Sequence, residues 1–233
     1  MYICTNYIMN YILHLDTSSD ICSVAISYGG ELLHVVAGSE SRNHAAYINE
    51  MIAQVLSLSG VSFSDISAVA VCEGPGSYTG LRIAMATAKG ICYANDLPLI
   101  LHSKLFLVSF SNTYFIDPIP AHSIAAVLVA REMEYFISVY DSSMDCLVAS
   151  THIPEPELAD ILLKQENLHI ISDAPMDLFY KLKVNFIDFQ ENITIDFKFW
   201  SKCAFASYIS KEFANVATSV PLYLKQVYTH NKL

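Results

Sequence analysis

Charge and glycine are both scarce in this chain of 233 residues. Only 15% of the residues are charged and only eight are glycine, whereas 53% are hydrophobic. A chain of this length and apolar content can build one large core or two modest ones. Its formal net charge of −10 produces a mean field that repels phosphate backbones. Unaided binding to RNA or to an anionic membrane is therefore disfavoured.

Paired cysteines and targeting signals are also missing. The six cysteines form no C-x-x-C pair, and their spacing fits neither a zinc ribbon nor a dense disulfide framework. They are typical of small buried hydrophobes in a reducing compartment. The start of the chain has no basic residue before its apolar stretch, which Asn6 and Asn10 interrupt. We therefore expect a cytoplasmic protein without membrane association, in which residues 1–8 are an extension that adds little structure.

The order of the predicted elements indicates the fold class. Strand-like segments at 11–15, 22–27 and 32–37 precede a helix at about 43–59, a buried strand at 68–72, a helix at 79–94 and a strand at 97–101. This is the order of one half of an actin-like or ribonuclease-H-like α/β protein. Beyond residue 104 the pattern weakens and predicts a reduced second copy. We expect two related subdomains, 1–103 and 104–233, and the terminal helix near 199–212 is a candidate to pack back on the first.

A glycine-rich turn connects the buried strand to the second long helix. Strand, turn and helix in this order can bind an anion, because backbone N–H groups and the helix N-terminus face the ligand. The string matches neither a P-loop nor a dinucleotide fingerprint, and it lacks the G-x-S-x-G of a nucleophile elbow. A plain turn that lets the helix lie close to the sheet is the favoured alternative. The motif residues are Gly74, Gly76, Ser77, Tyr78, Thr79, Gly80 and Arg82.

The two long helices carry more apolar surface than contact with one sheet requires. The apolar arc of the helix at 43–59 spans roughly 180°, where roughly 100° suffices to cover a sheet. Burial by the second subdomain is the commoner fate of such a surplus. The sharper hypothesis is a protein interface built from both helices. The residues assigned to it are Tyr47, Met51, Leu58, Ala84, Ala88 and Ile91.

Four strings in the sequence closely resemble the TsaB (YeaZ) family. They are HLDTS at 14–18, NH at 43–44, GPGSYTGLRI at 74–83 and PLYLK at 221–225, and the third is highly specific. The resemblance is dense in the N-terminal half and thin in the C-terminal half. It implies an actin-like protein without a complete catalytic centre, acting in the synthesis of the tRNA modification threonylcarbamoyladenosine (t6A).

The resemblance also implies partners. The chain is expected to bind and stabilise the transferase TsaD as a scaffold, with the ATPase TsaE in a larger complex. It is expected to reach tRNA only indirectly and to form a homodimer when alone. Both protein contacts would use the two apolar helices.

One departure from TsaD bears on catalysis. TsaD carries an H-x-x-x-H metal pair after the corresponding strand, because two imidazoles one helical turn apart can share a metal. Here His102 is followed four residues later by Phe106. A single imidazole cannot make that site, so no metal ligand, cofactor or catalytic residue is assigned.

A hypothesis from another class stays open. An active actin-like ATPase or acyl-group transferase would use Asp16 and the glycine-rich turn. Asp16 and Thr17 are candidates for a vestigial phosphate site, although Asp16 is better explained as holding a turn. The basic residues Arg82 and Lys225 are candidates to touch tRNA or a partner carboxylate. Solvated surface charge is the ordinary expectation for both.

Overall fold

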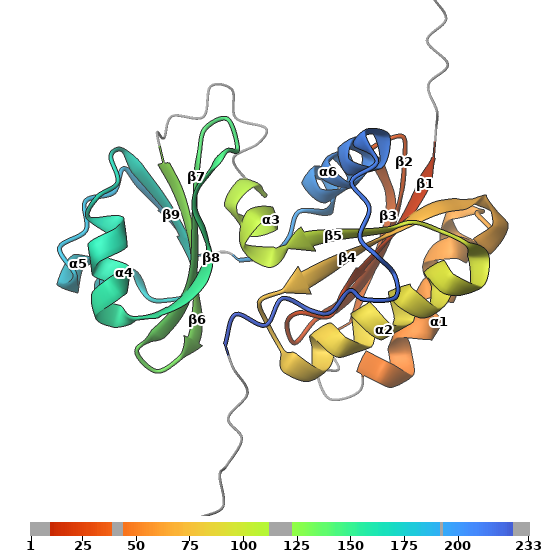
Figure 1. Ribbon diagram of the computed structural model, residues 1–233, viewed down its shortest axis with the longest axis horizontal. Coiled ribbons are helices and arrows are strands. Elements are labelled where there is room, and N and C mark those ends of the chain that lie inside the picture. Colours follow the sequence, from red (N-terminus) through yellow and green to blue (C-terminus); the bar gives the residue numbers. More distant parts are fainter. Residues whose placement is uncertain (1–9, 39–43, 112–122, 192, 226–233) are drawn as a thin grey trace, which may run out of the picture. The chain divides into compact units, whose positions relative to one another are not determined.

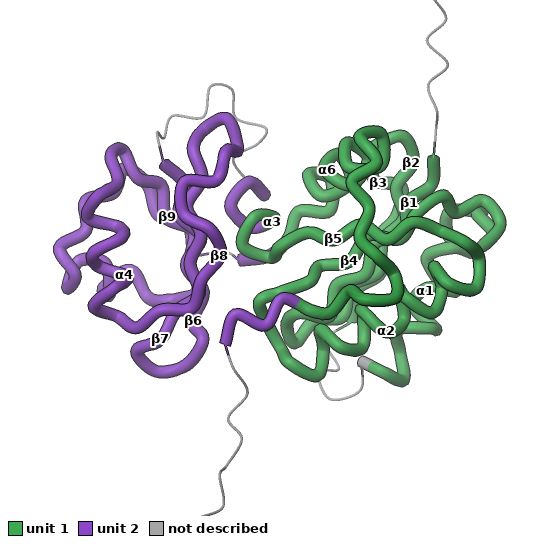
Figure 2. The backbone as a smooth tube through the Cα atoms, in the orientation of Figure 1, with its two compact units in different colours: residues 1–107, 195–221 green, residues 108–194, 222–233 purple. Residues whose placement is uncertain are grey.

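The computed structural model describes residues 10–38, 44–111, 123–191 and 193–225. It divides into two compact units, which Figure 2 distinguishes by colour. Unit 1 comprises residues 1–107 and 195–221, and unit 2 comprises residues 108–194 and 222–233. The expected N-terminal extension at 1–8 and Asn43 of the second family string lie outside the described residues.

Unit 1 is a five-stranded mixed sheet with helices on both faces (Figure 1). The strand order is β3-β2-β1-β4-β5; β2 runs antiparallel to β1 and to β3, while β1, β4 and β5 are parallel. The strands are β1 (Tyr11–Asp16), β2 (Cys22–Tyr28), β3 (Glu31–Gly38), β4 (Ile66–Gly74) and β5 (Leu99–Ser103). The helices are α1 (His44–Ser59), α2 (Tyr78–Asn95), α3 (Lys104–Phe110, shared with unit 2) and α6 (Phe197–Ser210), with a 3-10 turn at Phe63–Asp65.

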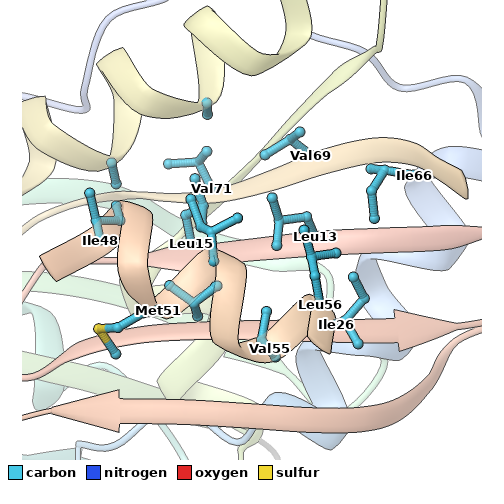
Figure 3. Packing of buried hydrophobic residues seen from close by; sticks show 14 of the residues in the cluster. Leu13, Leu15, Ile26, Ile48, Met51, Val55, Leu56, Ile66, Val69 and Val71 are labelled. Atoms are coloured by element: carbon cyan, nitrogen blue, oxygen red, sulfur yellow. The ribbon is translucent and has the colours of Figure 1, made fainter. Parts of the chain in front are cut away.

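The alternation of side chains along β1 assigns the two faces of this sheet. Leu13 and Leu15 belong to the core formed with α1 and α2, where Ile48 and Val55 of α1 are fully buried (Figure 3). His14 points to the other face, as the two-residue period of a strand requires, and its ring lies 5.0 Å from that of Trp200 on α6. The sheet is therefore buried on both sides.

Unit 2 repeats the topology of unit 1. Its sheet has the order β10-β9-β6-β7-β8, which is the order of unit 1 with β6 in the place of β1. Its strands are β6 (Ser123–Arg131), β7 (Glu134–Asp141), β8 (Cys146–Pro154), β9 (Leu168–Ser172) and β10 (Asp188–Gln190), and its own helices are α4 (Glu155–Leu162) and α5 (Met176–Lys181). The chain is thus a two-subdomain, actin-like α/β protein, as the element order predicted.

The boundary expected for the second subdomain, 104–233, needs a correction, whereas the terminal helix packs on the first subdomain as expected. Residues 195–221, including α6, belong to unit 1. The physical reason is burial, because Phe199, Trp200 and Ala204 of α6 are fully covered on the sheet of unit 1.

Within the described residues, no helix combines the length and the apolar character that crossing a membrane requires.

Candidate functional site

The polar turn after β1 lies directly against the glycine-rich turn after β4. The Asp16 carboxylate accepts the backbone N–H of Ser18 at 2.9 Å, so it holds the turn, as predicted. Thr17 Oγ1 donates to the carbonyl of Gly80 at 2.6 Å, and the carbonyl of Ser18 accepts the N–H of Ser77 at 2.8 Å. These bonds join two turns that are some sixty residues apart in the sequence.

Two glycines of the motif are required by this close approach. A Cβ atom on Gly76 would lie 2.2 Å from the carbonyl oxygen of Ser18, and one on Gly80 would lie 2.0 Å from that of Thr17. Both distances are far below van der Waals contact, and the obstacle is backbone. Gly74 has a different requirement, since its φ of 114° is a conformation that L side chains rarely adopt.

Two of the backbone donors that an anion could use at this turn are bonded within the chain. The N–H of Ser77 binds Ser18, and the N–H of Gly80 donates to the Ser77 hydroxyl at 3.2 Å as an N-cap bond. Ser77 is therefore the N-cap of α2. The motif positions α2 against the sheet, which is the alternative that the sequence favoured.

Buried charge does gather at the carboxyl ends of the parallel strands. Lys104, at the start of α3, is only 5% exposed, and the Asp16 side chain is also buried. Burial raises the pKa of the neighbouring Cys72 thiol above its usual range; the Asp16 carboxylate raises this pKa further and the Lys104 ammonium opposes the rise. The sequence carries no signal for this buried cation, because a lysine that opens a helix is ordinarily solvated.

His102 is enclosed by α6. Its Nδ1 accepts the indole N–H of Trp200 at 3.1 Å, and its Nε2 lies 3.4 Å from the Ser207 hydroxyl. Burial lowers the pKa of His102 to about 4, so the ring is neutral near pH 7. Phe106 stacks on His102 with ring centroids 6.4 Å apart. The described residues contain no group of three His, Cys, Asp or Glu side chains arranged to hold a metal.

The predicted interface needs a correction at three of its six residues. Ala84 and Ala88 are fully buried and Met51 is 7% exposed, all within the core of unit 1. Their small or flexible side chains let α1 and α2 lie close to the sheet, so these residues belong to the core of unit 1. Ile91 is partly buried against the same core. Tyr47 and Leu58 are the accessible ones, 36% and 55% exposed.

The outward surface of α2 is made by other residues. Arg82, Ala86 and Gly90 recur every fourth residue along the helix and are all exposed, and Tyr93 beside them is 87% exposed. A Cβ atom on Gly90 would meet nothing within 4 Å. On α1 the corresponding exposed residues include Ala46, Glu50, Ala53 and Ser57.

A flank of α2 is covered by the C-terminal segment of the chain. Lys89 Nζ donates to the carbonyls of Ala217 at 3.1 Å and Ser219 at 2.8 Å, and the N–H of Ala214 donates to the carbonyl of Leu99 at 2.8 Å. Val216 packs against the core beside α2. Part of the apolar surplus is thus covered by this segment of unit 1.

Lys225, a basic residue that the sequence offers as a partner contact, forms an ion pair within unit 2. Lys225 donates to the Glu134 carboxylate, which also accepts from Arg131 and lies 2.8 Å from Nε2 of His152. The bonds from Arg131 and Lys225 lower the pKa of Glu134 to about 2. Lys225 therefore anchors the last family string to unit 2 instead of standing free on the surface.

Comparison with known proteins identifies the family of the chain. A family model described as "TsaD: tRNA N6-adenosine threonylcarbamoyltransferase" matches residues 26–220. The chain belongs to this family. Within it, the chain is of the TsaB (YeaZ) type that its sequence strings predict.

The curated relatives match part of the chain. The tRNA threonylcarbamoyladenosine biosynthesis protein TsaB of Haemophilus influenzae is 35% identical over 127 residues, which are 54% of this chain and 52% of that protein. TsaB of Escherichia coli K12 is 39% identical over 100 residues, 42% of each. A tRNA N6-adenosine threonylcarbamoyltransferase of Clostridium perfringens is 39% identical over 82 residues, 35% of this chain and 24% of that protein. The chain thus spans about half the length of the TsaB relatives it matches.

Solved structures confirm the fold. YeaZ from Pseudomonas aeruginosa superposes with a TM-score of 0.76 at 22% identity, covering 93% of this chain and all of that one. The ethanolamine utilization protein EutJ from Carboxydothermus hydrogenoformans gives a TM-score of 0.51 at 8% identity, over 83% of this chain and 89% of that chain.

Proposed function

We propose that this chain is a non-catalytic subunit for t6A modification of tRNA, which acts as a scaffold that binds and stabilises a TsaD transferase. Several curated relatives of the chain are named TsaB biosynthesis proteins, and a transferase-named relative matches a shorter stretch of 82 residues. The proposal includes a cytoplasmic location, TsaE in a larger complex, indirect access to tRNA, and self-association in the absence of TsaD.

The observation that carries the proposal is the filled glycine-rich turn. The carbonyls of Thr17 and Ser18 lie where Cβ atoms on Gly80 and Gly76 would be, and the N–H of Ser77 is bonded. A phosphate approaching this turn would have to displace backbone that is hydrogen-bonded on both sides. The energetic role of the motif is then to fix α2, and a fixed helix favours binding of a partner because little order is lost on association.

The docking face is the outward surface of α1 and α2. It comprises the residues of these helices that are exposed. Ala86, Gly90 and Ala53 have small side chains that permit close approach of a partner helix, and Tyr93 offers a large exposed ring. Tyr47 and Leu58 extend the accessible apolar surface along α1. A helix pair from the partner would complete the packing on this side.

Substitution of Ala86 tests the docking face without disturbing the core. Ala86→Arg adds a bulky charge at an exposed position, so we expect loss of co-purification with TsaD while the monomer keeps its circular dichroism spectrum and melting temperature. Ala206→Arg, at an exposed alanine of α6 on the other side of the sheet, is the matched control and should retain the complex. Retention of the complex by Ala86→Arg would show that α2 does not face TsaD.

One observation favours a second candidate function, an ATPase or acyl-group transferase that uses Asp16 and the glycine-rich turn. Lys104 supplies a buried cation that, like Asp16, acts on the pKa of the Cys72 thiol, and a cation of this kind can bind a phosphate. The distinction between the two functions rests on whether the isolated chain binds nucleotide.

A further inference from the structure

Some residues of the glycine-rich turn motif pack against the rest of unit 1, and others are exposed. Gly76, Ser77 and Gly80 are explained by the turns they join. Tyr78 and Arg82, at the start of α2, are exposed and contribute nothing to the core. These two side chains therefore need a different explanation from the rest of the string.

Arg82 and Tyr78 form a stacked pair one helical turn apart. The guanidinium carbon of Arg82 lies 5.5 Å from the centre of the Tyr78 ring, and Nη1 lies 3.4 Å from the Tyr78 hydroxyl. The contact restricts the rotamers of the Arg82 side chain. The cation–π attraction itself contributes little free energy at an exposed site. The hydrogen bond to Tyr78 uses one of the five guanidinium N–H donors of Arg82.

No internal carboxylate satisfies this guanidinium within the described residues. Five ion pairs are found there, and none includes Arg82. The other basic side chain of α2, Lys89, is committed to two backbone carbonyls. Arg82 is thus an ordered, accessible cation on a chain with a net charge of −10.

We propose that Arg82, held by Tyr78, receives a carboxylate of the protein that docks on α1 and α2. This inference rests on the proposed function and adds a chemical requirement to it. The partner must place an Asp or Glu side chain opposite the N-terminal end of α2. Arg82 continues the exposed row of Ala86 and Gly90, so one partner can cover all three. An acidic side chain fits better than a nucleic-acid phosphate, because the net charge of the chain repels a polyanion.

A guanidinium is suited to this task in a way that an ammonium is not. Its planar fork can form two parallel hydrogen bonds to one carboxylate, whereas lysine acts as a compact point charge. At the edge of a small-residue helix face, such a bond would set the register of two packed helices. Interfaces concentrate their binding energy on Arg and Tyr anchors of this kind.

Titration of TsaD with four forms of the intact chain tests the inference. Arg82→Met is expected to raise the Kd by roughly tenfold or more and to flatten its dependence on salt, since a desolvated charge pair is lost. Arg82→Lys should recover only part of the affinity. Lys211→Met, which removes an exposed positive charge next to α6, is the charge-matched control and should bind like the parent chain.

The outcomes separate the inference from the proposed function. If Ala86→Arg abolishes binding but Arg82→Met binds TsaD with the parent affinity and salt dependence, the docking face stands and the carboxylate contact is wrong. If Arg82→Met weakens binding of tRNA to the complex without changing the affinity for TsaD, the ligand is a phosphate and the inference is overturned. If the parent chain itself does not bind TsaD, the proposed function fails and this inference fails with it.

Discussion

The indole N–H of Trp200 donates a hydrogen bond of 3.1 Å to Nδ1 of His102, and this bond ties α6 to the end of β5. The same indole lies edge-on to His14. His14 is fully buried and His102 is half-buried, and both are neutral, because desolvation lowers the pKa of His14 to about 3 and that of His102 to about 4. The C-terminal helix is thus fixed on the first subdomain by groups that must not be protonated.

The pH dependence of stability follows from these two histidines. Unfolding exposes them and restores a pKa near 6.5, so the unfolded chain binds more protons than the folded one below that pH. Their contribution is complete above pH 6.5 and is lost as the pH falls toward 4. The free energy of unfolding should fall by about 1.4 kcal/mol per pH unit for each group in this window.

Urea denaturation from pH 7 to pH 4.5 measures this slope. His102→Gln should reduce it by about 1.4 kcal/mol per pH unit, because one titrating group is removed. His34→Gln, at an exposed position of β3, is the control and should keep the parent slope. An unchanged slope in His102→Gln would contradict the burial of a neutral imidazole under α6.

The glycines of the motif predict a graded response to alanine. Gly76→Ala and Gly80→Ala place Cβ against backbone oxygens, so each should destabilise the chain by about 2 kcal/mol or more. Gly90→Ala, in open space on α2, should instead stabilise it by about 0.5–1 kcal/mol. Thermal and urea denaturation of the three variants would show the order; equal effects would mean that the turns do not meet as described.

Neighbouring alanines of α2 predict opposite outcomes for the same charge. Ala88→Glu buries an unpaired carboxylate against the sheet and should cost several kcal/mol of stability, enough to unfold a marginally stable domain. Ala86→Glu lies on the exposed row and should change stability by about 0.5 kcal/mol or less. Circular dichroism melting curves decide the matter, and a folded Ala88→Glu variant would place Ala88 on the surface after all.

Release of the C-terminal segment is measurable by hydrogen exchange. Lys89→Met removes the bonds to Ala217 and Ser219, so backbone amides between residues 214 and 219 should exchange roughly threefold to tenfold faster. Lys181→Met breaks an exposed ion pair with Glu155 in unit 2 and should leave these amides unchanged. Exchange at the parent rate in Lys89→Met would show that this lysine does not hold the segment.

Local patterns in the sequence were sufficient for the first subdomain. Buried strands with clear turn signals predicted the elements between residues 11 and 103, and the turn role of Asp16 followed from its position after a strand. In unit 2 the strands β8 and β10 and the helix α5 escaped prediction. The outer strand β8 is largely exposed and the other two elements are short, so none carries a strong periodic signal.

The errors at the candidate interface have a physical cause. Helical periodicity identifies an apolar arc but not what covers it. The pattern assigns Ala84 and Ala88 to the partner interface, whereas their small side chains pack in the core of unit 1. The segment that lies beside Lys89 comes from nearly 130 residues later in the chain, and a lysine bonded to distant carbonyls leaves no local signal.

The central claim is that the glycine-rich turn packs against the turn after β1 and does not bind a phosphate. Calorimetric titration of the isolated chain with ATP and Mg²⁺ tests this claim most directly. We expect no binding heat at micromolar to submillimolar nucleotide, in the parent chain and in Asp16→Ala alike. Micromolar binding that Asp16→Ala abolishes would contradict the account and assign the site to an active enzyme.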